Sequence, residues 1–209
     1  MTARDIARLA ALVIERYPEY YKWYSLKEVT FNEITQYNRN KLLWRDESVD
    51  GIKTGHTESA GYCLATSATK DGMRLITVVL GTASENARVE ASQALLNYGF
   101  RFFETHKLYA AGTQLTTSRI WKGATDSASL GIDRDLYVTI PRGQYQSLDA
   151  SMSIDNRIVA PVSAGQALGT VLVKLGEDIV AEQALVSLQD IGEGSIWQRI
   201  ADEALLYFE

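Results

Sequence analysis

Residues 52–80 read IKTGHTESAGYCLATSATKDGMRLITVVL, and this stretch decides the fold of the first half of the chain. Residues 62–69 and 73–80 are two strand-like runs, separated by the residues Lys-Asp-Gly at 70–72. An Asp-Gly pair between two such runs favours a tight antiparallel hairpin, because glycine adopts the positive φ that the turn requires. The sequence therefore predicts a hairpin over residues 62–80. Residues 52–57 lie at the entry of its first strand, so we expect their side chains to project from a sheet edge.

Helical patterns flank this hairpin in the sequence. Before it, apolar residues at helical spacing precede Pro18 and predict an amphipathic helix that ends near Tyr17. These apolar residues are Ile6, Leu9, Ala10, Ile14 and Tyr17. After the hairpin, Ser84 has the side chain of a helix N-cap, and Gly99 is a typical C-terminal stop. The apolar positions of this second helix, which we expect to cover the hairpin, are Ala87, Ala91, Leu95 and Tyr98.

The segment between the first helix and the hairpin is predicted to be extended and then irregular. The β-branched and aromatic residues Val29, Thr30, Phe31 and Ile34 alternate with polar ones and predict a short strand with an extended connection. Residues 36–41 read QYNRNK, a polar run rich in Asn, which tolerates left-handed backbone and forms local turns. We expect a loop there.

Beyond residue 108 the pattern changes to short alternating runs bounded by turn residues. These runs cover residues 136–140, 148–154, 168–173 and 185–188. Turns that recur at about 8–12 residues are typical of a β-sandwich or a small barrel. The sequence thus predicts an α+β unit over residues 1–105, an all-β domain over residues 106–194 and a helical tail over residues 195–209.

The tail has an amphipathic pattern. Its apolar stripe consists of Ile196, Ile200, Ala204 and Phe208, with Trp197 and Leu205 alongside. Its polar side carries Asp202 and Glu203 against one Arg199, so electrostatic attraction to anionic lipid is weak. Such a helix either packs on protein or lies in a membrane interface. The sequence favours packing and a peripheral contact with the inner membrane equally.

Composition and charge exclude several classes of function. The formal net charge of −5 and the pI near 5.2 give no electrostatic footprint for nucleic acid. Cys63 is the single cysteine, and His56 and His106 are the only histidines, so we expect no disulfide, no metal site and no cofactor. No segment reaches the roughly 20 apolar residues that span a bilayer. Residues 1–6 lack the layout of a secretory signal, so we expect the chain to begin inside a folded element.

The triplet Lys53-Thr54-Gly55 carries the chemistry that the sequence singles out. A ligand that ends in a free carboxylate needs a cation, a hydroxyl donor and a residue without a side chain that lets the backbone approach. An edge strand can also hydrogen-bond an extended peptide as an added strand. Taken alone, three such residues are more often a solvated lysine at a strand start followed by a glycine bulge. The surrounding residues decide between the two interpretations.

The residues around the triplet resemble those of the low-molecular-mass penicillin-binding proteins, the serine-type D-alanyl-D-alanine carboxypeptidases. The resembling segments are residues 38–40 (NRN), 43–44 (LW), 49–57 (VDGIKTGHT), 60–62 (AGY), 99–104 (GFRFFE), 128–131 (ASLG) and 139–143 (TIPRG), which extend over nearly the whole chain. The resemblance implies the C-terminal part of a penicillin-binding or β-lactamase-like domain, an antiparallel sheet with packed helices, followed by a small all-β sandwich. It also implies a periplasmic hydrolase that removes the terminal D-alanine from peptidoglycan stem pentapeptides through an acyl-serine intermediate and is acylated by β-lactams.

The resemblance implies roles for six residues. Lys53 resembles the lysine that helps to hold substrate and polarise the serine site, and Thr54, beside Gly55, would bind the terminal carboxylate. The backbone N–H of His56 matches the second oxyanion-hole donor, whereas its imidazole is expected to be structural. Arg39 and Arg88 resemble family arginines near the lysine strand that tune the charge of the site. A surface salt bridge is an equal alternative for each arginine.

The nucleophile motifs of this family do not occur at a plausible place in these 209 residues. The family uses Ser-x-x-Lys and Ser-x-Asn or Ser-Asp-Asn, but residues 25–27 (SLK) are one residue short and residues 153–156 (SIDN) fall in the β-domain. Acyl transfer needs an activated nucleophile, so we expect the isolated chain to be inactive and β-lactams to react only where the full site is assembled. A noncatalytic envelope binding or scaffold module remains the alternative. Apolar surface left on the first unit also predicts a homodimer.

Overall fold

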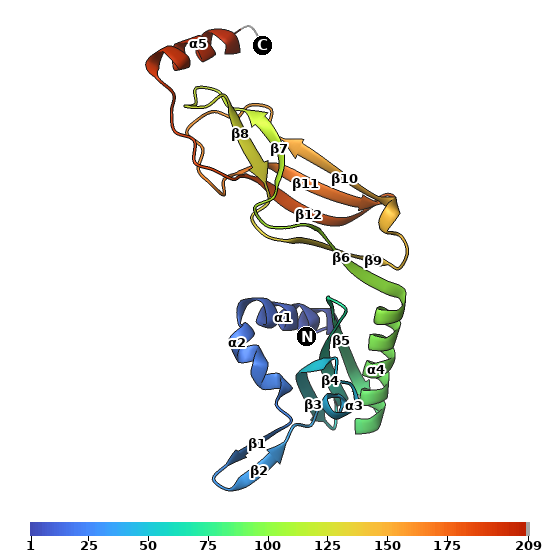
Figure 1. Ribbon diagram of the computed structural model, residues 1–209. Helices are drawn as coiled ribbons and strands as arrows, with labels where there is room; N and C mark the ends of the chain where they lie inside the picture. Colours follow the sequence, from blue (N-terminus) through green and yellow to red (C-terminus); the bar gives the residue numbers. More distant parts are fainter. Residues whose placement is uncertain (208–209) are drawn as a thin grey trace. The chain divides into compact units, whose positions relative to one another are not determined.

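The computed structural model describes residues 1–207, and the chain forms two compact units, Met1–Glu104 and Thr105–Glu209. The first unit is built on a three-stranded antiparallel sheet in the order β3-β4-β5 (Figure 1). Its strands are β3 (Val49–Thr57), β4 (Gly61–Lys70) and β5 (Met73–Thr82). Asp71 and Gly72 join β4 to β5 with φ of 51° and 78°, which confirms the predicted hairpin. In the described chain β3 lies at the sheet edge, as expected for the segment that holds Lys53.

Two helices cover the two faces of this sheet. The first is α1 (Ala3–Arg16), which ends where the sequence predicts and begins with a capping box between Thr2 and Asp5. The second is α4 (Glu85–Phe102), which Ser84 caps by accepting a hydrogen bond from the Ala87 N–H. Consecutive residues of a strand point to opposite faces, and Leu64 packs with α4 residues whereas Ala65 packs with α1 residues. The antiparallel sheet with packed helices is therefore confirmed.

The predicted apolar face of α4 is wrong at two of its four positions, whereas Ala87 and Ala91 are half-buried. Leu95 and Tyr98 are 47% and 58% exposed, and the buried residues of the helix are Arg88, Val89, Ser92, Leu96 and Gly99. The apolar residues of α4 itself are distributed over several sides of the helix, so the spacing of apolar residues alone does not define its buried face. The predicted stop at Gly99 is also wrong, because the helix continues to Phe102. Gly99 instead permits close packing on the sheet, since a Cβ there would lie 2.4 Å from Leu75 Cδ1.

Short elements connect α1 to the sheet. They are α2 (Pro18–Tyr21), the 3-10 helix η1 (Lys22–Ser25), β1 (Glu28–Phe31), β2 (Ile34–Tyr37) and α3 (Leu42–Arg45). The sequence predicts a single strand and then a loop over residues 36–41, but β1 and β2 form an exposed hairpin that includes Gln36 and Tyr37. Its two-residue turn consists of Asn32 and Glu33, both at positive φ. A glycine-free turn of this kind gives little signal in the sequence.

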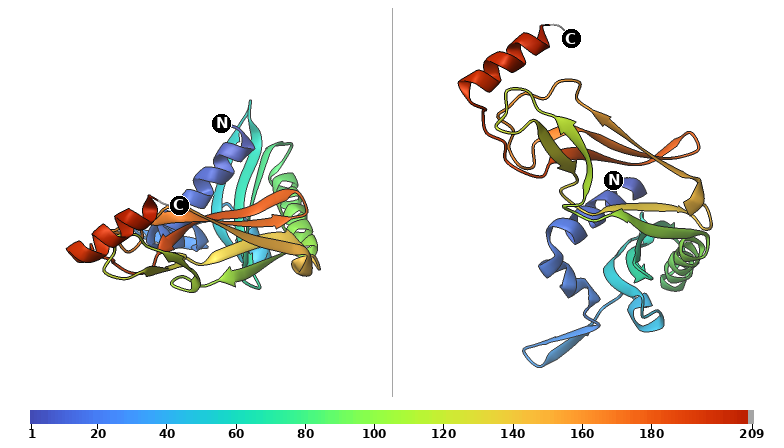
Figure 2. Two further views of the ribbon diagram at one scale, coloured as in Figure 1. Left: turned by 90° about the horizontal axis from the view of Figure 1, so that it is seen from above. Right: turned by 45° about the horizontal axis from the view of Figure 1, so that its top comes forward.

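The second unit is an all-β sandwich, as predicted (Figure 2). Its larger sheet has the antiparallel order β10-β11-β12-β8-β7, and β6 pairs with β9 in a second sheet. The strands are β6 (Phe103–Tyr109), β7 (Gln114–Arg119), β8 (Ser127–Gly131), β9 (Leu136–Pro141), β10 (Leu148–Ile154), β11 (Ala167–Leu175) and β12 (Asp178–Ser187), with the 3-10 helix η2 (Tyr145–Ser147) before β10. One core unites both sheets through side chains such as Leu130, Val138 and Val173.

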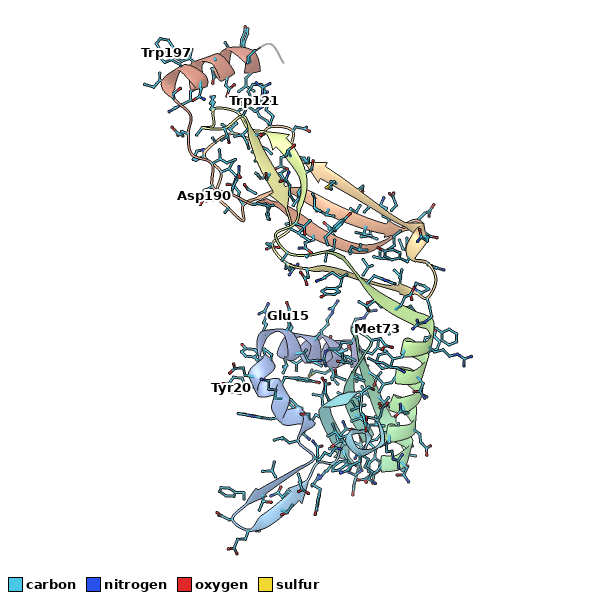
Figure 3. All side chains as sticks on the ribbon, in the orientation of Figure 1. Glu15, Tyr20, Met73, Trp121, Asp190 and Trp197 are labelled. Atoms are coloured by element: carbon cyan, nitrogen blue, oxygen red, sulfur yellow. The ribbon has the colours of Figure 1, made fainter. Side chains whose placement is uncertain are left out.

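The second unit ends in α5 (Ile196–Leu206), a helix capped by Ser195. Its acidic side contacts the β-sandwich, because Asp202 accepts a hydrogen bond from the Lys122 N–H and Glu203 pairs with the Lys122 side chain. Its apolar side chains are exposed: Trp197 is 81% exposed, and Figure 3 shows its position on α5. Phe208, the last residue of the predicted stripe, lies outside the described residues. No helix in residues 1–207 combines the length and the apolar run needed to cross a bilayer.

The close contact at Gly99 generates a stability prediction. Gly99→Val should lower the free energy of unfolding by about 1–3 kcal/mol, because the added carbons overlap Leu75 in a packed interface. Urea unfolding followed by circular dichroism measures the change. Ala94→Val, at an exposed position of the same helix, is the matched control and should cost less than about 1 kcal/mol. Introducing Leu75→Ala as well should reduce the additional cost of Gly99→Val, and equal costs in both backgrounds would contradict this interpretation.

Candidate functional site

One surface depression of the first unit brings together all six residues that the sequence singles out. Lys53, Thr54, Gly55 and His56 are consecutive in β3, and Arg39 precedes α3. Arg88 comes from the first turns of α4. The other residues that line the depression are Tyr62 and Glu85. Three segments that are far apart in the sequence therefore converge on the open edge of one strand.

The three residues of the Lys-Thr-Gly triplet differ in their exposure and in the contacts that they make on β3. Lys53 is exposed, and its Nζ donates a hydrogen bond to the Thr54 carbonyl at 2.7 Å. Thr54 is only 8% exposed yet lines the depression. A Cβ added at Gly55 would meet only the Cys63 Cβ, at 3.7 Å, which is an ordinary contact. The described chain therefore does not need glycine at this position, and the bare backbone leaves the strand accessible to a ligand.

Arg88 lies beneath the strand, and its side chain is only 3% exposed. Its Nη1 donates to the Gly55 carbonyl at 3.3 Å, and its Nη2 lies 3.6 Å from Glu85 Oε1. Its Nε has no hydrogen-bond partner among the described residues. Arg88 thus forms an ion pair, as in the alternative interpretation, but its own guanidinium is buried and not at the surface. Arg88 supports the carbonyl that follows Thr54.

Tyr62 connects the arginine to the histidine. Its ring lies opposite His56 in the β3–β4 register, with ring centroids 4.0 Å apart and planes tilted by 31°. On the same ring, the Arg88 guanidinium carbon lies 5.5 Å from the centroid. The imidazole therefore has a packing partner, and Tyr62 links the outer strand to the helix behind it. The sequence analysis gave Tyr62 no role in the site, because its place beside His56 depends on strand register.

The side chains of Asn40 and Asp50 fix the base of β3. Asn40 is fully buried, and its Nδ2 donates to the Gly51 carbonyl at 3.0 Å while its Oδ1 accepts from the Leu42 N–H at 3.2 Å. Asp50 accepts hydrogen bonds from the Tyr21 hydroxyl and from Arg74 Nη1, each at 2.7 Å. Burial raises the pKa of Tyr21, so this phenol stays protonated and donates to Asp50. These contacts position the strand without occupying the depression.

The depression is cationic with one acidic side chain. Arg39, Lys53 and Arg88 line it, and Glu85 is its only carboxylate among the described lining residues. Lys41 Nζ lies 3.0 Å from Glu85 Oε2, and the hydrogen bond and charge of Lys41 lower the pKa of Glu85. Glu85 is therefore ionised near neutral pH. Within residues 1–207, no group of three or more His, Cys, Asp or Glu side chains is placed to hold a metal ion.

The serines closest to a nucleophile motif lie elsewhere. Ser25 ends η1, where its Oγ donates to the Lys22 carbonyl at 2.8 Å, a local turn contact. Ser153 belongs to β10 of the second unit. The depression in residues 1–104 thus has cations, a hydroxyl and an open strand, and no serine lines it in the described chain.

Comparison with known proteins agrees with this geometry. Residues 1–84 match the family model "D-alanyl-D-alanine carboxypeptidase", and residues 103–193 match "Penicillin-binding protein 5, C-terminal domain". The D-alanyl-D-alanine carboxypeptidases DacA and DacC of Escherichia coli strain K12 are 43% and 41% identical to this chain. Each match covers 99% of this chain and 52% of the relative. The chain thus spans about half the length of the curated relatives it matches.

A solved structure of penicillin binding protein 5 from Haemophilus influenzae is also similar, with a TM-score of 0.81 and 42% identity. That match covers 92% of this chain and 57% of the other. The Lys-Thr-Gly strand lies in the part matched by the first family model, and the β-sandwich lies in the part matched by the second. The chain therefore belongs to the D-alanyl-D-alanine carboxypeptidase family of penicillin-binding proteins, of which it represents a C-terminal portion.

Proposed function

We propose that this chain supplies the substrate-binding edge of a serine D-alanyl-D-alanine carboxypeptidase, which removes the terminal D-alanine from peptidoglycan stem pentapeptides. The observation that carries this proposal is the depression along β3, where a hydroxyl, a bare glycine and three cationic side chains converge. The cationic side chains and the hydroxyl of this depression can bind the free C-terminal carboxylate of a peptide, and the open edge of β3 can hydrogen-bond the peptide backbone.

The roles follow from the position of each residue along the strand. The Thr54 hydroxyl would bind the terminal carboxylate, and Lys53 would supply positive charge and polarise the serine site. The backbone N–H of His56 would donate to the oxyanion as the acyl bond forms, and such a donor is worth about 3–4 kcal/mol in comparable hydrolases. Gly55 leaves room for the peptide. Each role uses a residue that lines the same depression.

The two arginines have different positions in this proposal. Arg88 is buried under the strand, so it would hold the Gly55 carbonyl and contribute its charge to the depression. Arg39 is exposed where it lines the depression and is the arginine better placed to meet a ligand. Both raise the positive potential that a carboxylate meets as it enters the depression.

The nucleophile completes the reaction from outside these 209 residues. Hydrolysis through an acyl-serine requires a serine, a base and the oxyanion donors in one site. The residues around β3 provide the binding edge and an oxyanion donor, so the chain by itself would bind substrate without cleaving it. A β-lactam would react only when a segment with Ser-x-x-Lys is present beside β3.

The remaining assignments concern location and assembly. We place the penicillin-binding part at residues 1–105, the β-sandwich domain at 106–194 and the amphipathic helix at 195–209, in a periplasmic protein. The exposed apolar side chains Ile196 and Trp197 would bring α5 to the inner-membrane surface. Homodimerisation would rest on apolar side chains exposed on the first unit, such as Leu9, Phe31 and Ile34.

Replacing the Thr54 hydroxyl tests the proposed carboxylate contact. Thr54→Val keeps the shape of the side chain and should weaken binding of N-acetyl-D-alanyl-D-alanine about tenfold, because a hydrogen bond to a charged group is lost. Titration followed by NMR measures the dissociation constant. Thr69→Val, at an exposed position of β4, is the matched control and should leave binding unchanged. Equal affinity of the wild-type chain for the dipeptide and its C-terminal amide would contradict the carboxylate site.

Labelling with penicillin tests the proposed absence of the nucleophile. A fluorescent penicillin should leave no covalent adduct on this chain, as measured by denaturing gel and intact mass. Addition of a polypeptide carrying the matching Ser-x-x-Lys segment should restore labelling on that polypeptide. An adduct on the isolated chain would show that one of its own serines is activated, and it would overturn this part of the proposal.

The exposed side of α5 generates a prediction for membrane contact. Trp197→Ser should lower the partition of the chain onto phosphatidylglycerol-containing vesicles at least about fivefold, because a large apolar side chain is lost from the contact surface. Flotation of vesicles measures the bound fraction. Trp44→Ser is the control, since Trp44 is also exposed and lies in α3 of the first unit. The membrane proposal fails if wild-type protein does not float, or if both variants lose binding alike.

A further inference from the structure

Glu85 is an acidic residue in a depression whose other charged lining residues are basic. Its side chain is 48% exposed, in the first turn of α4. Oε2 lies 3.0 Å from Lys41 Nζ, and Oε1 lies 3.6 Å from Arg88 Nη2. The two oxygens therefore contact different cations. The function proposed above gives Glu85 no role, although it lines the same depression as Thr54 and Arg39.

The charges around Glu85 make it a competitor for any anion that enters. Lys41, then Arg88 and Arg39, lower the pKa of Glu85, although burial opposes them. The carboxylate is thus ionised and already interacts with the cations that a ligand carboxylate would meet. A ligand must either share these cations with Glu85 or displace it, and two carboxylates near each other repel.

Lys41 determines how much of Glu85 is directed at the depression. Lys41 is the residue before α3, and its ion pair with Glu85 joins the loop that holds Arg39 to the first turn of α4. With one oxygen on Lys41, only the other faces Arg88. Loss of Lys41 would release both oxygens to the arginines, so Lys41 limits the competition that Glu85 exerts.

We propose that Glu85 is an internal counter-ion of the carboxylate site that sets how strongly the site binds anions. The inference rests on the proposed function of the β3 edge. Because Glu85 weakens the attraction of the cations for every anion, small free anions such as acetate bind poorly. An extended peptide compensates through backbone hydrogen bonds along β3, so with Glu85 present the peptide occupies the site at concentrations at which a small free anion does not.

A purely structural role for Glu85 predicts a different result. A carboxylate in the first turn of a helix interacts favourably with the helix dipole, and an exposed ion pair to Lys41 contributes modestly to stability. Such a role changes the unfolding midpoint and leaves ligand affinity unchanged. Affinity for anions is therefore the readout that separates the two roles.

The test measures the affinity of the full chain for three ligands by NMR titration at low ionic strength. The ligands are N-acetyl-D-alanyl-D-alanine, its C-terminal amide, and acetate. Glu85→Gln should raise the affinity for the dipeptide about two- to fivefold, which is the range expected for removal of a partly exposed charge. The affinity for acetate should rise by at least the same factor. Affinity for the amide should not change. Glu90→Gln removes the same charge from an exposed position of α4 and is the matched control.

A second variant tests the link through Lys41. Lys41→Met should weaken dipeptide binding in the wild-type background, because Glu85 then turns both oxygens toward the arginines. In the Glu85→Gln background the same change should have a clearly smaller effect. Equal effects in both backgrounds would mean that Lys41 acts as an independent charge, and the counter-ion proposal would be wrong.

The outcomes separate this inference from the function on which it rests. Suppose that the wild-type chain prefers the carboxylate dipeptide to its amide. If Glu85→Gln then binds the dipeptide no more tightly than wild type, or if Glu90→Gln raises the affinity by the same factor, the role of Glu85 is overturned and the carboxylate site stands. If the wild-type chain and all variants bind the carboxylate and the amide alike, both proposals fail.

Discussion

The site depends on how an edge strand is held while its outer side stays open. An edge strand has unpaired backbone groups on one side, which makes it both a binding surface and a liability. In β3 the carbonyls of Gly51 and Gly55 accept hydrogen bonds from the buried side chains of Asn40 and Arg88. The strand is thus fixed by side chains that come from a loop and a helix. Lys53 and Thr54 lie between these two points and are presented without a second strand on the outer side of β3.

Arg88 also determines the electrostatics of the depression. A buried guanidinium is costly unless its charge is compensated and its donors are paired. Glu85 compensates part of the charge, the Gly55 carbonyl accepts one donor, and the Tyr62 ring packs beside the guanidinium. The same arrangement leaves a depression that is lined by three cationic side chains and one carboxylate. Support of the strand and tuning of its charge therefore use the same residues.

In the second unit, the contacts of the acidic residues of α5 change how its amphipathic sequence is interpreted. In the sequence, Asp202 and Glu203 weaken the case for a lipid-binding helix, because anionic lipid repels them. In the structure both acids contact Lys122 of the β-sandwich, and Arg119 lies 3.7 Å from Asp202. The acidic side of α5 is thereby directed to protein, and its apolar side chains remain exposed. The side of the helix that faces the β-sandwich is thus set by ion pairs with Lys122 and Arg119, which lie outside the helix.

The sequence by itself determined the elements whose causes are local. The Asp71-Gly72 turn, the cap at Ser84 and the alternation of the β-sandwich strands depend on neighbouring residues, so the β4–β5 hairpin, the start of α4 and the fold class were predictable. The triplet at Lys53 and the residues around it also identified the family. Only the tertiary structure decided the rest. It buried Arg88, and it used Gly99 for helix packing rather than for a stop. It also brought Tyr62 and Glu85 into the depression, because strand register and the rotation of a helix are set by contacts between distant segments.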